Sequence, residues 1–455
     1  MAKERIVIIG ADAAGMSAAG QARKLLPGAE ITAYERSPHC SYAACGIPYY
    51  TAGLVESETR LIARTPGQFL ERQNIVVRTR CEVLSVNTDE GSMTVRDLES
   101  GKEFSDRFDK LLFATGAVPA IPPVEGSDAK GVFSLSTLES GIAVRKFADE
   151  ERPKRVTVIG GGYIGLEMAE AFSCIRGLEV TLLDKSPQVM NTFDPDMAEF
   201  MAQAIREAGT ELRLGEGLVA FGVKDGRVRT VITEKGEIET DMVVMGLGVR
   251  PNTALAREAG LELSVRDSIR VDGSMATSRP NVWAAGDCAS TTHLITGKPF
   301  WIALGTVANK TGRVAGISMG GGGASFGGVV GTAMSKHCAF ETARTGLTEK
   351  EAAEHGFKYV STVIKTKTRA GYYPGAEVMH VKLVAEKGTG RLLGGQIVGG
   401  QGAAKRVDIL ATALTAKMTL QELIDLDLGY APPFSPVWDP VQIAGRSLLG
   451  KMGGE

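Results

Sequence analysis

The chain has 455 residues, 44% hydrophobic and 23% charged; this length exceeds what one hydrophobic core usually serves and predicts two or three domains. A formal net charge of −2, with acids and bases interspersed, gives no long-range field suited to nucleic acid or to an anionic membrane surface. No apolar segment approaches the roughly 20 residues needed to cross a bilayer, and the short apolar run near the N-terminus is too brief for a signal-peptide core.

The first predicted unit starts with a buried-strand pattern at residues 5–10, RIVIIG, and runs through a glycine-containing turn into an alanine-rich helix. Glycines such as Gly10 and Gly15 allow a tight turn, and the helix N-terminus offers unpaired N–H groups to a pyrophosphate. A second strand, ITAYE, ends at Glu35, where an acid can accept hydrogen bonds from an adenosine ribose. Asp12 replaces the middle glycine of the pattern, so backbone approach should be looser here.

The same pattern recurs at residues 155–160, RVTVIG, which lead through Gly160, Gly162 and Gly165 into a second helical stretch. The following strand, EVTLLD, ends at Asp184, in the position that Glu35 has in the first unit. Two complete units in one chain predict two dinucleotide-binding domains and two bound dinucleotides.

Further segments separate the domains. Residues 114–119 and 245–252 are typical of strand exits between domains, and the strand NVWAAGD ends at Asp287. The last of these resembles the second flavin motif of the two-dinucleotide flavoproteins, whose aspartate holds the ribityl chain. We predict a discontinuous FAD domain, an inserted NAD(P)H domain and a C-terminal domain, with the boundaries 1–118 plus 246–318, 119–245 and 325–455.

Residues 325–455 contain no nucleotide motif and mix strand patterns such as HVKLVAE with a helical stretch at 403–417. An independent, unrelated domain is one interpretation; in the flavoprotein family that the chain resembles, this region forms the dimer interface. The predicted fold class is therefore α/β, with two Rossmann-like dinucleotide-binding domains followed by a C-terminal α+β dimerisation domain.

The segment from Cys40 to Tyr50 reads CSYAACGIPYY and follows Glu35 closely. Its pattern Ser-Tyr-x-x-Cys-Gly-x-Pro-Tyr resembles the active-site segment of the single-cysteine branch of the FAD/NAD(P)-dependent pyridine nucleotide-disulfide oxidoreductases. That branch includes coenzyme A-disulfide reductases, NADH oxidases and NADH peroxidases, and the similarity runs through the whole chain. The resemblance implies that electrons pass from NAD(P)H through FAD to Cys45, and then to coenzyme A disulfide or a related persulfide or polysulfide.

Cys45 precedes a predicted helix start at Gly46 and Pro48, where the helix dipole favours the thiolate that nucleophilic exchange requires. A buried structural thiol is the plain alternative. An internal disulfide with Cys40, as in the glutathione reductase branch, is another, but that branch uses a C-terminal His-x-x-x-x-Glu pair. None of the five histidines lies in the terminal 75 residues.

The remaining cysteines give no further site. All six are dispersed along the chain, unlike those of small disulfide-rich secreted domains, so we expect mostly reduced thiols and a cytoplasmic protein. Neither cysteines nor histidines show the spacing of metal ligands, and we predict no metal site.

Two tyrosine segments, residues 371–375 and 429–434, resemble those that coenzyme A-disulfide reductases bring across the dimer interface to the partner's cysteine. Tyr372 and Tyr430 match the tyrosine positions of that family. An alignment shifted by one residue would place Tyr373 at the first position instead. The resemblance implies a homodimer with a shared active site, in which both phenols assist a departing thiolate. Simple packing at an interface is the alternative.

The glycine-containing turn between strand and helix of each unit is called its fingerprint below. Peroxidases and many oxidases of this branch have a histidine in the first fingerprint, where this chain has Ala13. This difference favours a disulfide, polysulfide or persulfide reductase over an NADH oxidase, and Cys45 itself argues against a plain flavoprotein electron carrier.

Polar residues that match a coenzyme A site are Ser17, Gln21, Lys24, Ser41 and Asn309. Lys24 keeps the charge of an arginine without its bidentate fork, and Ala44 replaces an asparagine of some members. Each polar residue alone is more often a solvated surface group.

The motifs and the resemblance together assign the cofactor-binding residues, and the resemblance implies that coenzyme A can be bound to Cys45. The assigned residues are Gly10, Ala11, Ala14, Gly15, Glu35, Arg36, Val83, Ala114, Thr115, Gly116, Asp287, Gly160, Gly162, Tyr163, Ile164, Gly165, Asp184, Lys185 and Gly248. Asp184 should repel a 2′-phosphate and favour NADH, whereas Lys185 offsets part of that repulsion and leaves use of NADPH open.

Overall fold

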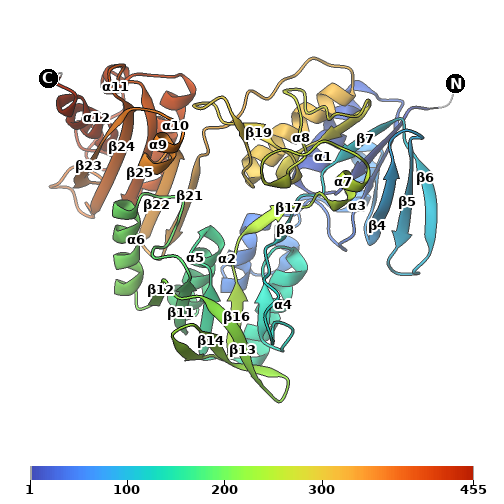
Figure 1. Ribbon diagram of the computed structural model, residues 1–455, viewed down its shortest axis with the longest axis horizontal. Coiled ribbons are helices and arrows are strands. Elements are labelled where there is room, and N and C mark those ends of the chain that lie inside the picture. Colours follow the sequence, from blue (N-terminus) through green and yellow to red (C-terminus); the bar gives the residue numbers. More distant parts are fainter. Residues whose placement is uncertain (1–2, 454–455) are drawn as a thin grey trace.

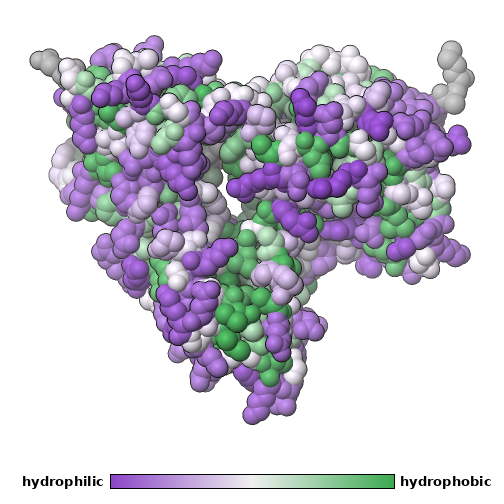
Figure 2. Space-filling view, in the orientation of Figure 1, coloured by the Kyte–Doolittle hydropathy of each residue, from purple (hydrophilic) through white to green (hydrophobic). Residues whose placement is uncertain are grey.

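The computed structural model describes residues 3–453, which form three lobes (Figure 1). The blue N-terminal lobe and the green lobe each contain a parallel sheet, and the orange-red C-terminal lobe contains an antiparallel one. The space-filling view shows a hollow where the three lobes meet (Figure 2). Among the helices of residues 3–453, none has the length and apolar character required to span a membrane.

The first lobe is built on a parallel sheet with the strand order β18-β7-β1-β2-β3. Alternate residues of β1 are buried on opposite faces: Ile6 and Ile8 cluster with helices α1 and α8, whereas Val7 and Ile9 cluster with the small antiparallel sheet β4-β5-β6. Burial on both faces explains why this strand is a continuous apolar run. The elements are β1 (Arg5–Ile9), α1 (Ala13–Leu25), β2 (Glu30–Tyr34), α2 (Ile47–Ala52), α3 (Pro66–Gln73), β3 (Ile75–Arg78), β4 (Cys81–Asn87), β5 (Ser92–Asp97), β6 (Glu103–Arg107), β7 (Lys110–Phe113), α7 (Ala254–Glu258), β18 (Val282–Ala284) and α8 (Gly305–Met319).

The second lobe repeats this plan. Its parallel sheet has the order β12-β11-β10-β16-β9; Val156 and Val158 of β10 cluster with helices, and Ile159 clusters with the antiparallel sheet β13-β14-β15. The predicted duplication and fold class are therefore confirmed. The elements are β9 (Val132–Ser134), α4 (Leu138–Glu151), β10 (Arg155–Ile159), α5 (Tyr163–Glu170), the π-helical turn η3 (Ala171–Ile175), β11 (Glu179–Asp184), α6 (Pro195–Glu207), β12 (Glu211–Leu214), β13 (Leu218–Lys224), β14 (Arg227–Thr233), β15 (Gly236–Glu239) and β16 (Met242–Met245).

Two short antiparallel strands connect these lobes. They are β8 (Ala117–Pro119) and β17 (Val249–Pro251), and both lie within the segments that the sequence predicts as exits. After β17 the chain returns to the first lobe, where β18 pairs with β7. Segments on either side of the second lobe thus contribute to one sheet.

The C-terminal lobe is an antiparallel sheet with helices packed against it, in the order β21-β22-β25-β24-β23. The predicted helix at 403–417 is shorter in the structure, because its first residues form the separate turn η6 (Ala404–Arg406). The elements are β21 (Ala333–His337), β22 (Phe340–Gly346), α9 (Glu349–Glu354), β23 (Tyr359–Lys367), β24 (Val378–Glu386), β25 (Leu392–Gly399), α10 (Val407–Thr415), α11 (Leu420–Ile424) and α12 (Pro440–Lys451).

A buried lysine joins the second and third lobes. The Lys382 side chain on β24 is only 2% exposed, and its Nζ lies 2.8 Å from Asp196, 3.3 Å from Asp194 and 3.2 Å from Glu349. Because a buried charge is costly unless it is paired and hydrogen-bonded, this group holds the start of α6 against the C-terminal sheet.

Helices α1 and α8 cross at a contact that only small residues allow. A Cβ added at Gly316 would lie 2.3 Å from the Ala18 carbonyl oxygen, and one added at Gly312 would lie 2.2 Å from that of Ala14. The crossing therefore seats α1, which begins at the first fingerprint turn, directly on α8.

We predict that Gly316→Ala destabilises the protein by about 1–3 kcal/mol, because the added methyl group overpacks this crossing. The matched control is Gly305→Ala at the start of α8, where an added Cβ meets nothing within 4 Å. Thermal melting followed by circular dichroism compares the two; equal melting temperatures would contradict the close-crossing argument.

Candidate active site

Each parallel-sheet lobe has a fingerprint turn that only glycine can form without strain. Gly10 has φ +100°, and a Cβ there would lie 2.2 Å from the Ala114 carbonyl oxygen; Gly160 has φ +109°, and its Cβ would lie 2.4 Å from that of Gly246. These turns keep the strand end and the helix start close together. The helix N-terminus can then face a bound pyrophosphate in each lobe.

The two acids predicted to bind ribose occupy equivalent places. Glu35 Oε2 accepts a hydrogen bond from the Ala11 backbone N–H at 3.0 Å, and Asp184 Oδ2 accepts one from the Gly161 N–H at 2.6 Å. The other carboxylate oxygens accept from the N–H groups of Ser37 and Ser186 at 2.9 and 2.7 Å. Both acids are thereby fixed beside their fingerprint turns, as the sequence predicts.

Asp12 ties the first fingerprint to the segment that carries Cys45. Its Oδ1 accepts a hydrogen bond from the Tyr42 backbone N–H at 3.1 Å, and the Ser41 N–H donates to the Ala11 carbonyl at 2.9 Å. Burial raises the pKa of Asp12 to about 6. The residue that departs from the glycine pattern thus positions the redox segment, a role that its sequence position alone does not show.

Asp287 follows β18 and lies next to the N-terminal part of α8. Burial raises the pKa of its carboxyl to about 6, and no group within residues 3–453 donates a hydrogen bond to that carboxyl. A partly buried acceptor without a protein partner fits a ligand hydroxyl, such as those of a ribityl chain. The first lobe therefore has the features that FAD requires.

Cys45 lies in the short turn η1 (Ala44–Gly46), immediately before α2, and its residue is exposed. Partial burial of the thiol raises the pKa of Cys45, and the carboxyl groups of Glu167 and Asp287 raise it further. This direction is opposite to the one expected from the helix dipole. The main reason is desolvation of the thiol; the two acids from different lobes add to it, and the dipole of α2 is weak because the helix spans only six residues.

Cys40 does not pair with Cys45. Its side chain is 2% exposed, and its Sγ lies 3.6 Å from the Arg64 carbonyl oxygen. Burial raises the pKa of Cys40 to about 11, which keeps the thiol protonated. Both cysteines are free thiols in the structure, so the arrangement does not support an internal C-x4-C redox disulfide.

Glu167 is a site residue that the sequence reasoning missed. It lies on α5 of the second lobe, and burial, followed by the nearby Glu170, raises the pKa of its carboxyl to about 7. The sequence signal that could have found it is an acidic residue in the second turn of the helix that follows the Gly160 fingerprint. Only the packing of α2 against α5 shows that it lies close enough to Cys45 for its charge to act on the thiol.

Residues that match a coenzyme A site lie along one side of α1. Ser17, Gln21 and Lys24 follow each other at helical spacing, and the Ser17 hydroxyl donates to Asn309 Oδ1 of α8 at 2.9 Å. Lys24 is exposed, as a phosphate ligand must be. Ser41 stands beside this helix through its bond to Ala11 and leads on to Cys45. The structure thus brings together residues separated by 292 positions in the sequence.

The two tyrosine segments lie side by side in the C-terminal lobe, where the Ala370 N–H donates to the Pro432 carbonyl at 3.2 Å. Tyr372 and Tyr430 are 78% and 46% exposed. The pKa of Tyr430 is raised mainly by its interaction with the Tyr372 hydroxyl. This proximity favours Tyr372 over Tyr373 as the partner of Tyr430.

The other predicted cofactor residues are spread around the two fingerprints. Ala114, Thr115 and Gly116 follow β7, Arg36 follows Glu35 and is exposed, and Val83 lies in β4; in the second lobe Tyr163 and Ile164 begin α5, Lys185 follows Asp184 and is exposed, and Gly248 precedes β17 with φ +85°.

Comparison with known proteins identifies the family. Residues 4–312 match the family described as pyridine nucleotide-disulphide oxidoreductase, and residues 332–440 match its dimerisation domain. The chain belongs to this family, and it is an FAD- and NAD(P)H-dependent oxidoreductase with two Rossmann-like domains and a dimerisation domain.

Several similar proteins define the branch. An NAD(P)H sulfur oxidoreductase (CoA-dependent) of Pyrococcus furiosus is 40% identical, with 98% of this chain and 100% of that protein covered. A coenzyme A disulfide reductase of Staphylococcus haemolyticus is 30% identical (97% and 98% covered), and an NADH oxidase of Methanocaldococcus jannaschii is 37% identical (98% and 99% covered). The structure of an NAD-dependent persulfide reductase from A. fulgidus matches with a TM-score of 0.95 and 37% identity, covering 99% of this chain and 84% of that one. The predicted resemblance to coenzyme A-disulfide reductases is confirmed.

We predict that Glu167→Gln accelerates alkylation of Cys45 several-fold above pH 7. In the wild type, Glu167 ionises as the pH rises through about 7 and opposes ionisation of the neighbouring thiol, so removing this charge lowers the pKa of Cys45. The measurement is the iodoacetamide rate against pH, with the exposed Glu150→Gln as the control. A profile unchanged by Glu167→Gln would show that this carboxyl does not act on the sulfur.

Proposed function

We propose that this enzyme uses Cys45 to reduce coenzyme A disulfide or a related persulfide or polysulfide. The observation that carries the proposal is the placement of one exposed thiol where both nucleotide lobes meet. Asp12 of the first fingerprint holds the Cys45 segment, and the charge of Glu167 in the second lobe acts on the Cys45 thiol. Cys40 is buried and unpaired, so the second sulfur of the exchange must come from the substrate.

FAD would be held by the first fingerprint, Glu35 and Asp287, and would supply to sulfur the electron pair of a hydride from NAD(P)H. The Cys45 thiolate attacks one sulfur of the substrate disulfide, so one S–S bond breaks, a mixed disulfide forms and one thiolate leaves with a proton. The arriving electron pair then cleaves the mixed disulfide, which releases the second thiol and restores the Cys45 thiolate. One cysteine is sufficient because the substrate contributes the partner sulfur.

The stripe of Ser17, Gln21 and Lys24 supports coenzyme A as the group that delivers this sulfur. These side chains and Asn309 lie on α1 and α8, beside the Ser41 end of the Cys45 segment. A lysine supplies positive charge for a phosphate, and the serine and amide groups can bind polar atoms of the ligand. The substrate is thus proposed to lie along α1 with its sulfur toward Cys45.

The dimerisation domain indicates a homodimer. We propose further that the partner's dimerisation domain completes the active site with Tyr372 and Tyr430. Their exposure on one protomer, together with exposed Phe434 and Trp438 nearby in sequence, supports an interface at this face. We also propose a cytoplasmic location, on the ground that four of the six cysteines are free.

An NADH oxidase is the second candidate, because a relative of that name is 37% identical. Ala13 in place of the histidine typical of the peroxidases and many oxidases counts against it. The two activities differ in whether NADH is consumed aerobically without any sulfur substrate.

We predict that Cys45→Ser lowers anaerobic reduction of coenzyme A disulfide and polysulfide by NADH about a thousandfold or more, because no nucleophile remains. Cys40→Ser is the matched control and should keep near-normal turnover. Intact mass under non-reducing conditions should show a coenzyme A adduct on the wild type but not on Cys45→Ser. Full turnover of Cys45→Ser would refute the proposal, and fast aerobic NADH consumption without disulfide would favour the oxidase.

We predict that Tyr372→Phe and Tyr430→Phe each lower kcat about tenfold, with little change in the KM for NADH, because a phenol assists the departing thiolate. Tyr373→Phe serves as the control and should behave as the wild type. Steady-state kinetics on coenzyme A disulfide distinguishes Tyr372 from Tyr373 as the assisting phenol. A fall in kcat confined to Tyr373→Phe would assign the role to Tyr373 instead.

We predict a higher kcat/KM for NADH than for NADPH, and a ratio that shifts at least about tenfold toward NADPH in Asp184→Ala. The variant removes the carboxylate that repels a 2′-phosphate while Lys185 keeps its charge. Lys185→Ala should shift the ratio in the opposite direction. Kinetics with both reductants provides the measurement, and a native preference for NADPH would contradict the role given to Asp184.

A further inference from the structure

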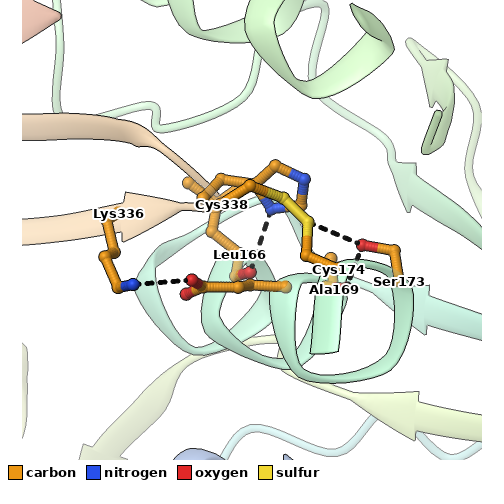
Figure 3. The surroundings of a disulfide bond; sticks show 8 residues. Leu166, Ala169, Ser173, Cys174, Lys336 and Cys338 are labelled. Atoms are coloured by element: carbon orange, nitrogen blue, oxygen red, sulfur yellow. Dashed lines mark hydrogen bonds and ion pairs between the residues drawn. A yellow bond between two sulfur atoms is a disulfide. The ribbon is translucent and has the colours of Figure 1, made fainter. Parts of the chain in front are cut away.

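Two cysteines that take no part in the proposed reaction meet between the second and third lobes. Cys174, in the turn η3 that continues α5, is joined by its sulfur to Cys338, in the turn between β21 and β22 (Figure 3). Their Cα atoms are 5.9 Å apart, within the range of disulfides, although 164 positions separate them in the sequence. The sequence reasoning left both among the reduced thiols, because their distance along the chain hides the contact.

This sulfur pair is reachable from solvent. Cys174 is exposed and Cys338 is partly exposed, whereas the free thiols Cys40, Cys81 and Cys288 are buried. Small thiols and disulfides can therefore reach the pair, since exchange requires access to the attacked sulfur. Among the cysteines of residues 3–453, only Cys45 is exposed as a free thiol.

A buried histidine adjoins the two sulfurs. His337 is 2% exposed; its Nδ1 lies 3.5 Å from the Leu166 carbonyl oxygen, and its Nε2 is buried without a hydrogen-bond partner. One ring nitrogen lies within 4.8 Å of both sulfur atoms. Burial lowers the pKa of His337, which disfavours a charged ring beside the two sulfurs and leaves an unpartnered ring nitrogen there.

The pair also fixes the strand that packs on α5. Lys336 of β21, two residues before Cys338, lies 3.0 Å from Glu170 Oε1, and Figure 3 shows this ion pair beside the sulfur link. The carboxyl of Glu170 is buried, and one turn earlier α5 carries Glu167, which lies near Cys45. A covalent link here therefore holds the C-terminal sheet against the helix that contributes to the active site.

We propose that Cys174 and Cys338 are a thiol–disulfide exchange site, a clasp between the NAD(P)H-binding lobe and the C-terminal domain that small thiols open and small disulfides close. On closing, the thiolate of exposed Cys174 attacks a disulfide RSSR, forms a mixed disulfide and releases one RS⁻. The Cys338 thiol then gives its proton to the released RS⁻, and its sulfur displaces the second RS⁻, which takes up the proton that Cys174 lost to solvent when it ionised. The net change oxidises two cysteine thiols to one disulfide and reduces RSSR to two RSH; opening is the reverse.

The clasp is tested on the full-length holoenzyme, equilibrated in buffers of reduced and oxidised dithiothreitol and then blocked with N-ethylmaleimide. Non-reducing peptide mapping should show a peptide that contains linked Cys174 and Cys338, with a fraction that changes reversibly with the buffer ratio. Two blocked thiols at every ratio would overturn the proposal. One tightly bound zinc ion per chain, lost in His337→Gln, would also overturn it, because the three side chains would then be metal ligands.

Thermal melting supplies a second readout. The wild type should melt about 5 °C higher in oxidising than in reducing buffer, because the closed clasp constrains a long loop of the unfolded chain. The double variant Cys174→Ser, Cys338→Ser should lose this difference, whereas Cys81→Ser should keep it. Cys45→Ser should keep it as well, which separates failure of the clasp from failure of the proposed reaction. A redox-dependent melting shift that survives in the double variant would contradict the proposal.

Discussion

The fold of both nucleotide lobes rests on the positive φ of the glycines that follow β1 and β10. At Gly10 and Gly160 the chain turns so tightly that a side chain would collide with the backbone of the neighbouring strand exit. This turn brings the helix start and the following acid, Glu35 or Asp184, to the same end of the sheet. The helix N-terminus that can face a pyrophosphate and the acid that can bind a ribose therefore lie together at the carboxyl ends of the strands.

The redox segment lies where these two ends approach each other. Residues around Cys45 are bound to the first fingerprint through Asp12, while α2 packs into the core of the second lobe. Arg145 of α4 strengthens this junction by donating to the carbonyl groups of Tyr50 and Val55 at 3.1 and 2.7 Å. Cys45 is therefore exposed although both nucleotide lobes hold its segment in place.

Much of this arrangement was predictable. Strand, turn and helix signals repeat locally in the sequence, so the duplication, the two acids beside the fingerprint turns and the two lobe exits follow from patterns a few residues long. The CSYAACGIPYY segment likewise identifies Cys45 through a match that needs no three-dimensional information. The ionisation of Cys45 was not predictable in this way, because Glu167 and Asp287 come from other parts of the chain.

Local patterns in the sequence are enough to predict the fold class and the two nucleotide units and to single out Cys45 as the proposed redox cysteine, because each depends on residues that are close along the chain. The folded chain was needed to show that Asp12 supports the Cys45 segment, that Glu167 lies near Cys45 and that Cys174 meets Cys338. Those contacts join separate elements and lobes, and their geometry depends on how sheets and helices pack. Packing is a property of the whole folded chain, which no short pattern contains.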